Sequence, residues 1–232
     1  MNAHNQILTS LSADVRDRLL PHCNSVTLAQ GDVIYRPGET LTQLYFPINC
    51  LLSVTITMED GSVAEVGMVG RRGMLGIHAF LSNQEIIQTE CAAQVPGEAV
   101  KIAVPVLRQE FDRNGELRDV LLRYAQAFVA QVSQTAACNS LHTLEQRLPR
   151  WLLEVQSRIG SDELPLTQEF IATMLGVRRA GVTQTAQRLQ ERKLIQYHRG
   201  HVQILNQAGL EASACECFKT VQGQYNRLLG EQ

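Results

Sequence analysis

The stretch TQEFIATMLGVRRAGVTQTAQRLQERKLIQYHRGHVQIL, residues 167–205, decides the architecture of this chain. Hydrophobic residues recur in it at three- and four-residue spacing, which predicts two helices. Thr167 is a good N-cap for the first helix, and Gly176 is the residue type that ends a helix in a tight turn. Arg199-Gly200 then provides a hairpin turn between short strands at 195–198 and 201–205. The segment therefore predicts a helix-turn-helix followed by a β-hairpin wing.

The second predicted helix has a hydrophobic inner face and a polar outer face. Val182, Ala186 and Leu189 share the inner face at helical spacing. Guanidinium and amide groups, which make paired hydrogen bonds with base edges in the major groove, dominate the outer face. The outward residues are Arg178, Arg179, Thr183, Gln184 and Gln187. We therefore expect double-stranded DNA as the partner.

Local charge agrees with a DNA partner, although the charge of the whole chain does not. The chain has a formal net charge of −2. Six basic residues stand against two acidic ones between residues 167 and 203, so this segment carries +4 and the remainder −6. One basic face on an acidic body is typical of a protein that binds phosphates with that face alone. A helix pair exposed only to solvent would not need this asymmetry.

Length and composition exclude several classes of protein. A chain of 232 residues, 44% of them hydrophobic, is long enough for two domains. No hydrophobic run approaches the roughly 20 residues that span a bilayer, and the N-terminus lacks the pattern of a signal peptide, so we expect a cytoplasmic protein without a membrane segment. The six cysteines are too scattered for a disulfide framework. No nucleophile–base pair or phosphate-binding loop is present, so no catalytic residue is predicted.

The close cysteine pair, Cys215 and Cys217, is interpreted as part of a core. Hydrophobic residues at helical spacing follow Asn206, a possible cap, and predict one C-terminal helix with Cys217 on its packing face. These residues are Leu210, Ala214, Cys217, Val221, Tyr225 and Leu228. Because no second pair or histidine cluster has the spacing of a zinc site, no metal site is predicted.

The N-terminal part reads as a short helix followed by antiparallel β structure. Ser12 can cap a helix at 13–20, which Pro21 ends. Short alternating runs then predict strands at 25–28, 33–35, 43–47, 51–58, 63–68, 88–95 and 99–103. Asp60-Gly61 and Pro96-Gly97 are turn signals between them. Such strands favour a β-roll or barrel, which we assign to a domain at 1–115.

Residues 116–140 predict one long helix, because they contain neither glycine nor proline. Its hydrophobic residues define a seam, and Leu122, Ala125 and Val129 widen it. We expect one side to pack on the β domain and the seam to pack on a second subunit; the alternative is a single helix buried in a monomer. The seam consists of Leu117, Leu121, Tyr124, Phe128, Val132, Thr135 and Cys138, of which all but Cys138 are assigned to the dimer interface.

A new helix is expected after a break at 139–142. Thr143 and Gln146 fit a capping box, and Pro149 inside the helix predicts some kinking. The chain is thus divided into a β-roll domain at 1–115, a dimerisation helix and hinge at 116–142, and a winged helix-turn-helix domain at 143–232. The predicted fold class is α+β.

This order of parts resembles the cyclic-AMP receptor protein/fumarate-nitrate reduction regulator (CRP/FNR) family of bacterial transcription factors over nearly the whole chain. The matching phrases are QGDVIYRPGE (30–39), Asp60-Gly61, GRRGMLGI (70–77), RLPRWLL (147–153) and LTQEFIATMLGVRRAGVTQTAQRLQ (166–190). The helix-turn-helix phrase is the more specific. The resemblance implies a homodimeric, sequence-specific DNA-binding regulator with RNA polymerase as a further partner.

The resemblance also implies roles for the DNA-binding residues. Arg179 matches the arginine that reads guanine through its O6 and N7 atoms, and Arg178 and Gln184 complete the base-reading set. Ala180 stands where well-known members carry a glutamate, and Gln184 where the cyclic-AMP receptor carries a second arginine, so a different operator is expected. Expected phosphate contacts are Thr167, Gln168, Thr183 and Arg199.

The effector pocket departs further from the family pattern. Members that bind cyclic AMP hold it with a Gly-Glu and an Arg-Ser pair; Ile77 aligns with the glutamate and Ile87-Gln88 with the Arg-Ser pair. Burying a phosphate without a neighbouring cation costs roughly several kcal/mol of free energy, so binding of cyclic AMP is not expected. Arg71 and Arg72 could replace the missing charge, or could simply be solvated. The full predicted pocket is Arg71, Arg72, Gly73, Gly76, Ile77, Ile87 and Gln88.

No cofactor is predicted. Only Cys23 precedes residue 50, so the N-terminal cysteine cluster of the iron–sulfur members is absent. His78 lies near the position of the axial histidine of haem members, but a lone histidine in a loop is more often structural. The effector could be a cyclic dinucleotide, a metabolite or nothing. The alternative function is a binding module for such a small ligand that acts mainly through protein contacts.

Overall fold

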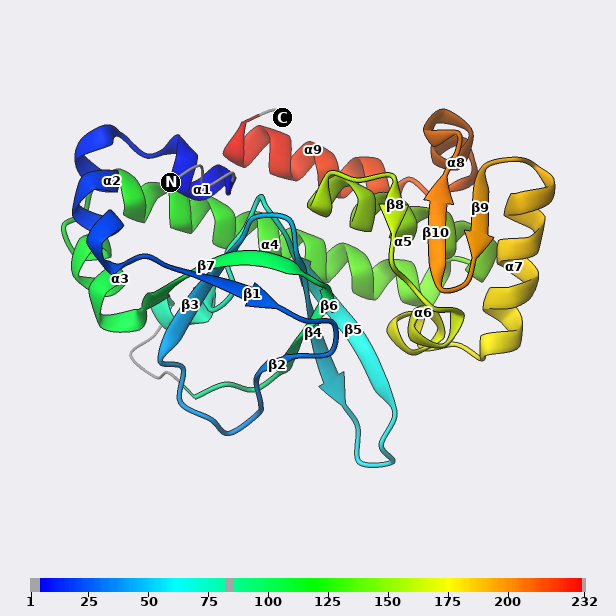
Figure 1. Cartoon of the computed structure of the whole chain (residues 1–232), viewed down its shortest axis with the longest axis horizontal. Helices are drawn as coiled ribbons and strands as arrows, with labels where there is room; N and C mark the ends of the chain where they lie inside the picture. The colour runs from blue at the N-terminus through cyan, green and yellow to red at the C-terminus, as the bar shows by residue number, and fades with distance from the viewer. Residues whose placement is uncertain (1–4, 82–85, 231–232) are drawn as a thin grey trace.

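The computed structural model describes residues 5–81 and 86–230. It consists of a β-roll at the N-terminal end and a helix-turn-helix unit at the other end, with the long helix α4 (Glu116–Leu141) running between them (Figure 1). Within the described ranges, no helix is both long and hydrophobic enough to cross a membrane. The α+β fold class predicted from the sequence is confirmed.

Two antiparallel sheets form the β-roll. One has the strand order β1-β7-β3 and the other β2-β6-β4-β5. All seven predicted strands are present, with ends that differ by at most two residues from the predicted ones. The strands are β1 (Asn24–Leu28), β2 (Val33–Tyr35), β3 (Gln43–Pro47), β4 (Leu51–Thr57), β5 (Val63–Val69), β6 (Glu90–Val95) and β7 (Gly97–Ala103).

Short helices close the roll at both ends of its sequence. Ser12 precedes α2 (Ala13–Leu19) as predicted, and the helix tightens into the 3-10 turn Leu20–His22 at the expected proline. Three helical elements of this domain were not predicted: α1 (Gln6–Ser10), a second 3-10 turn at Ile77–Phe80, and α3 (Val104–Phe111). The side chain of Asn5 caps α1 by accepting hydrogen bonds from the backbone N–H groups of Ile7 and Leu8.

Helix α4 confirms the predicted long helix but corrects its packing. Leu117, Leu121 and Tyr124 are completely buried in the core of their own subunit, and Thr135 is buried too. In this conformation Leu117, Leu121 and Tyr124 pack within their own chain, against the β-roll and the C-terminal helix, which leaves their assignment to a dimer interface a prediction without support from their burial. Phe128 and Val132 are half-buried. Burial of part of the seam within its own chain is what the alternative predicted, whereas the pairing of subunits stays a prediction.

The hinge and the next helix follow the predicted signals. Helix α5 (Leu144–Ile159) begins with a capping box in which Thr143 and Gln146 exchange hydrogen bonds, and it contains Pro149. Gly160 ends the helix in the left-handed conformation at φ 73°. Trp151 is completely buried, so α5 is the central helix of the helix-turn-helix end.

The helix-turn-helix and wing lie where the sequence predicts them. They comprise α6 (Gln168–Leu175), α7 (Arg179–Glu191) and a three-stranded sheet of order β8-β10-β9, made of β8 (Glu163–Leu164), β9 (Ile195–His198) and β10 (His201–Ile204). Val182, Ala186 and Leu189 are buried, as expected for the inner face of α7.

The C-terminal segment is two helices rather than the predicted one. After Asn206, which caps as expected through Gly209, α8 (Gln207–Ser213) ends and α9 (Cys217–Leu229) begins in a new direction. Helix α9 packs along α4, with Val221 and Tyr225 buried in the core of the β-roll (Figure 1). The break is necessary because a continuous helix would carry these residues away from α4.

Candidate nucleic-acid interface and effector cavity

Helix α7 presents its polar face to solvent. Arg178, at its N-cap, and Arg179, Thr183, Gln184 and Gln187 are all exposed, which confirms the predicted orientation. Arg179 lies 3.8 Å from the Glu169 carboxylate, but both side chains are more than 60% exposed. An ion pair this exposed contributes little energy, so it leaves the guanidinium available to a base edge.

The turn between α6 and α7 fixes the register of that face. Thr167 accepts a hydrogen bond from the backbone N–H of Phe170 and so starts α6. Gly176 ends α6 at φ 62°, a backbone conformation that favours glycine. The hydroxyl of Thr183 donates to the side-chain oxygen of Gln168 at 2.6 Å. The two helices are thereby tied together at their exposed edge, beside the predicted phosphate contacts.

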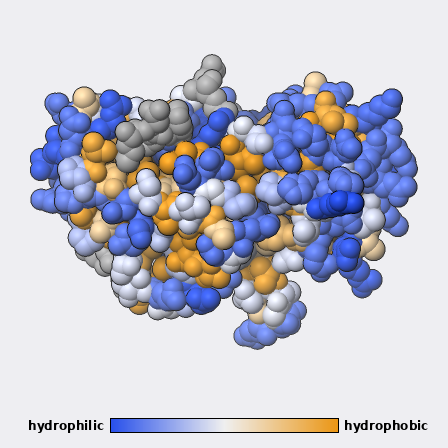
Figure 2. All heavy atoms as spheres, viewed as in Figure 1, coloured by the Kyte–Doolittle hydropathy of each residue, from blue (hydrophilic) through white to orange (hydrophobic). Residues whose placement is uncertain are grey.

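The wing places one more cation on the same end of the molecule. Arg199 and Gly200 both have positive φ, at 46° and 85°, as a type I′ hairpin turn requires. Arg199 is exposed at the tip. Figure 2 shows that the surface at this end of the molecule is hydrophilic, whereas hydrophobic residues gather over the β-roll. The basic excess predicted from the sequence thus occupies a solvent-facing polar surface.

The helix-turn-helix end is joined to the β-roll by a buried carboxyl group. Glu65 of β5 accepts hydrogen bonds from Ser53 Oγ of β4 at 2.5 Å and from Trp151 Nε1 of α5 at 2.8 Å. Burial raises the pKa of Glu65 to about 7. Helix α6 packs on β5 next to this contact, and Met174 Sδ lies 3.3 Å from the same Ser53 Oγ. The helix-turn-helix is thus docked on the sensor-like domain in this conformation.

A cavity of about 660 Å³ lies between the β-roll and α4. Hydrophobic side chains dominate its wall, and none of the described lining residues carries a carboxylate, ammonium or guanidinium group. They are Tyr35, Val54, Ile56, Val66, Val69, Met74, Leu75, Gly76, Ile77, His78, Leu81, Ile86, Gln88, Thr89, Ala125, Phe128, Val129, Val132 and Ser133. Burial lowers the pKa of His78, which favours the neutral form of its ring.

Of the predicted pocket residues, Gly76, Ile77 and Gln88 line this cavity, whereas Arg71, Arg72, Gly73 and Ile87 do not. Arg72 is 3% exposed and serves another purpose. Its guanidinium donates to Gln6 Oε1 at 2.8 Å, to Asn226 Oδ1 at 2.9 Å and to the carbonyl of Gly230 at 2.8 Å. It therefore anchors the C-terminal helix.

The glycines of the GRRGMLGI phrase are explained by close approach. A Cβ at Gly73 would lie 2.6 Å from the hydroxyl of Tyr124 on α4. Gly76 has φ +98°, and a Cβ there would meet Leu44 at 2.6 Å. The loop therefore brings the cavity wall into direct contact with α4. Anything that fills the cavity touches the same helix.

Helix α4 keeps a second face open to solvent. Leu122 and Val129 are 42% and 59% exposed, and Ala136, another seven residues on, is exposed as well. A seven-residue spacing puts such residues on one stripe of a helix. Val129 also lines the cavity, so this stripe and the cavity adjoin.

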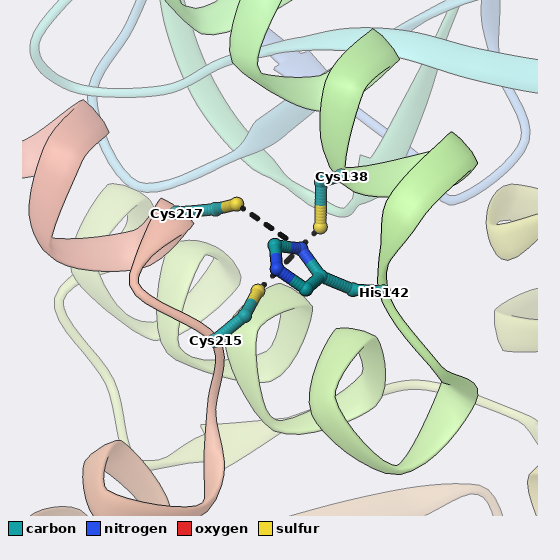
Figure 3. A group of neighbouring side chains, drawn as sticks. All are labelled: Cys138, His142, Cys215 and Cys217. Carbon is teal, nitrogen blue, oxygen red and sulfur yellow. Dashed lines mark hydrogen bonds between the residues drawn. The ribbon is translucent and has the colours of Figure 1, made fainter.

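One group of functional side chains was missed by sequence reasoning. Cys138 and His142, at the end of α4, lie against Cys215 and Cys217 (Figure 3). The signal available was that Cys138 and His142 are four residues apart at a helix end, which places both on one side. Their distance in sequence from the Cys-x-Cys pair concealed the group.

The chain matches two family models. The cyclic nucleotide-binding domain matches residues 25–114, and the Crp-like helix-turn-helix domain matches residues 146–213. Among curated proteins, the global nitrogen regulator of Synechococcus elongatus is 21% identical over 189 residues, covering 78% of this chain and 85% of the relative. The global nitrogen regulator of Nostoc sp. is 22% identical over 186 residues, covering 77% and 83%.

Solved structures share the fold. FixK2 from Bradyrhizobium japonicum has a TM-score of 0.71 at 13% identity, covering 83% of this chain and 98% of its own. The c-di-GMP-responsive global regulator CLP from Xanthomonas campestris has a TM-score of 0.63 at 17% identity, covering 83% and 99%. A CRP/FNR-family transcriptional regulator from Thermus thermophilus has a TM-score of 0.62 at 21% identity, covering 82% and 98%.

Proposed function

The chain belongs to the CRP/FNR family of transcription regulators, and we propose that it binds near-palindromic DNA as a homodimer and does not respond to cyclic AMP. The observation that carries the DNA part is the outward polar face of α7, on which Arg178, Arg179 and Gln184 are all exposed. The surrounding basic residues supply the phosphate attraction. Bacterial DNA lies in the cytoplasm, so the protein acts there, with RNA polymerase as the partner that reads its position.

Base reading is assigned to three side chains. Arg179 donates two N–H groups to guanine, and Gln184 pairs with adenine, each for about 1–3 kcal/mol of discrimination. Arg178, at the N-cap, approaches the neighbouring base pair. Thr167, Gln168, Thr183 and the wing residue Arg199 hold the phosphates and set the register.

Dimerisation is assigned to the exposed stripe of α4 rather than to its buried seam. Leu122, Val129 and Ala136 lie seven residues apart, and the first two are large hydrophobic side chains exposed to solvent. Pairing this stripe with its copy would bury it and place two α7 helices on one side of the dimer. Half-sites would then lie about 34 Å apart, one turn of DNA.

The cavity supports an effector that is largely uncharged. The phosphate of a cyclic nucleotide would contact a hydrophobic wall. Removing the phosphate from water without a neighbouring cation costs roughly several kcal/mol of free energy. His78 Nε2 is buried in the cavity region and has no hydrogen-bond partner among the described residues. It can satisfy one polar atom of a mainly hydrophobic ligand. A cyclic dinucleotide, with two phosphates, fits this wall less well than such a ligand does.

Three measurements test the proposal. A gel shift with random duplex DNA should show binding that weakens steeply with salt. Sedimentation should give a dimer, twice the 25.8 kDa mass of one chain. Calorimetry with cyclic AMP should give no saturable heat at micromolar concentration. Salt-independent binding would contradict the DNA interface, a monomer would contradict the α4 stripe, and a clean cyclic-AMP isotherm would contradict the account of the cavity.

A further inference from the structure

Four side chains with metal-binding atoms converge at the hinge end of α4. Cys138 lies in the last turn of α4, His142 follows that helix, Cys215 lies between α8 and α9, and Cys217 begins α9. One donor atom from each lies within 4.8 Å of all the others. Figure 3 shows the three sulfur atoms and the imidazole ring pointing toward a common centre.

The distances match one tetrahedral metal ion. Cys138 Sγ lies 3.5 Å from Cys215 Sγ, and Cys217 Sγ lies 3.5 Å from His142 Nδ1. Zinc bonds of about 2.3 Å to sulfur and about 2.0 Å to nitrogen place tetrahedral donor atoms about 3.5–3.8 Å apart. An iron–sulfur cluster would instead hold its thiolates apart on opposite sides of an inorganic core.

Local structure brings the two halves of the group together. Cys138 and His142 are four residues apart, so they lie on one side of the helix end, where the backbone N–H of His142 donates to the carbonyl of Cys138 at 3.1 Å. On the other half, the break between α8 and α9 points Cys215 and Cys217 the same way. Had residues 207–229 formed one continuous helix, two residues apart in sequence would have faced different directions.

Neighbouring groups supply what a metal site needs around its ligands. His142 Nε2, the ring nitrogen other than the one beside Cys217 Sγ, lies 3.4 Å from the carboxylate of Glu216. A metal-binding histidine usually donates the N–H of its other ring nitrogen to a carboxylate, a backbone carbonyl or water. Gln134 Nε2 donates to Cys217 Sγ at 3.1 Å. Arg150 of α5 interacts electrostatically with Cys138 and Cys215, which offsets the negative charge that three thiolates bring.

We propose that Cys138, His142, Cys215 and Cys217 bind one thiophilic divalent metal ion, and that Zn²⁺ is the best fit. Sulfur and imidazole donors in a tetrahedron favour zinc and disfavour calcium or magnesium, which take oxygen ligands. Four protein ligands close the coordination sphere, so the site is structural. Binding replaces one proton on each of the three thiols, and these protons are released to solvent. The His142 side chain is 17% exposed, which gives the ion a route of entry.

The location gives the ion a consequence for DNA binding, a part that rests on the proposed function. The ligands link the end of α4 to the start of α9, and Thr143, which begins α5, follows His142 directly. A bound ion therefore fixes the direction in which the DNA-binding end leaves α4. We expect removal of the metal to weaken binding to a selected duplex about tenfold.

Cobalt titration of the full-length, reduced protein tests the site. One equivalent of Co²⁺ per chain should give the visible bands of tetrahedral cobalt and a near-ultraviolet thiolate charge-transfer band, and Zn²⁺ should abolish both. Cys215→Ser should weaken Co²⁺ binding at least about tenfold, whereas Cys23→Ser, which removes a thiol outside the group, should not. His142→Cys should keep the tetrahedral bands and strengthen the charge transfer, which a merely misfolded variant would not do.

Several results would overturn the proposal. One is a six-coordinate cobalt spectrum, or none, from the wild-type protein. Another is a Cys138–Cys215 disulfide found by mass spectrometry in protein purified under reducing, zinc-replete conditions. Equal DNA affinity of metal-loaded and metal-free protein would contradict only the claim that the ion orients the DNA-binding end, and not the metal site itself. Failure of both forms to bind DNA would contradict the proposed function and leave the cobalt spectrum as evidence for the site.

Discussion

The two ends of this molecule present opposite chemistry to their partners. At the DNA-binding end, α7 carries guanidinium and amide groups on an exposed face, and the surface there is hydrophilic (Figure 2). At the other end, the cavity of the β-roll is lined by hydrophobic side chains, and Arg72, which the sequence suggested for it, is buried elsewhere. The output surface thus presents the polar groups that the family resemblance implies, whereas the described residues that line the cavity include no carboxylate, ammonium or guanidinium group.

This difference shows that a family's functional residues must be compared with this chain separately for each domain. The chain has both domains of the family in order. A DNA-reading helix needs only exposed donors at the right spacing, and local sequence supplies them. A phosphate pocket needs a cation and an acceptor converging from separate strands, and one substitution at each place is enough to remove it.

The largest expected effect comes from the DNA-reading end. Arg179→Ala should weaken binding to a selected duplex by about 2–6 kcal/mol, since each of two half-sites loses about 1–3 kcal/mol. Selectivity at one base pair per half-site should relax. Titration by fluorescence anisotropy measures both. Arg227→Ala, which removes an exposed arginine from α9, is the matched control and should change little; unchanged binding by Arg179→Ala would remove Arg179 from the base-reading set.

The contact between the two ends gives the next effect. Glu65 has a folded-state pKa of about 7, above the ordinary value of 4.5, because it is buried. Between these values the folded state holds a proton that the unfolded state has lost, so stability falls as pH rises from 4.5 to 7, by about 3 kcal/mol. Besides burial, the pKa of this carboxyl depends on the groups that face it, which are Ser53, Trp151, Arg150 and Glu154.

Urea unfolding at pH 5 and pH 8 measures that slope. Glu65→Gln should flatten it, because the amide does not ionise and can still accept the indole hydrogen bond. Glu98→Gln, at an exposed position on β7, should leave the slope as in the wild type. A slope that survives in Glu65→Gln would show that other groups produce it.

The hinge between the two ends should give a smaller effect. Thr143→Ala removes the N-cap side chain of α5 and the hydrogen bond that its hydroxyl donates to Gln146 Oε1, at a cost of about 1 kcal/mol in the free energy of unfolding. Ser140→Ala, three residues earlier on the exposed side of α4, should stay within about 0.5 kcal/mol. Equal losses in the two variants would mean that the capping box does not stabilise the start of α5.

The smallest effect is expected at the wing. Arg199→Ala should reduce the slope of log affinity against log salt by about one in each half-site, without changing base preference. Gel shifts at several salt concentrations measure it. A change in the preferred bases would assign Arg199 to base reading instead.

The features that sequence predicts best in this chain are local. The seven strands, the Thr167 and Thr143 caps and the Arg199-Gly200 turn each depend on residues a few positions apart. The structure differs where distant segments meet. Leu117, Leu121 and Tyr124 of the α4 seam are buried by the β-roll and by α9 of the same chain. Helix α9 reaches α4 only because the chain changes direction after α8, at a break that contains no glycine or proline and so could not be predicted. The same change of direction places Cys215 against Cys138. It also places Asn226 and Gly230 where the Arg72 guanidinium donates to them instead of lining the cavity.

Selection of bound sequences from a random pool of duplex DNA tests the central claim most directly. We predict a near-palindrome whose half-sites are centred about 34 Å apart, each with one guanine whose preference disappears in Arg179→Ala. Bound sequences with no common motif, or a motif unchanged by Arg179→Ala, would contradict the claim that α7 reads DNA in this register.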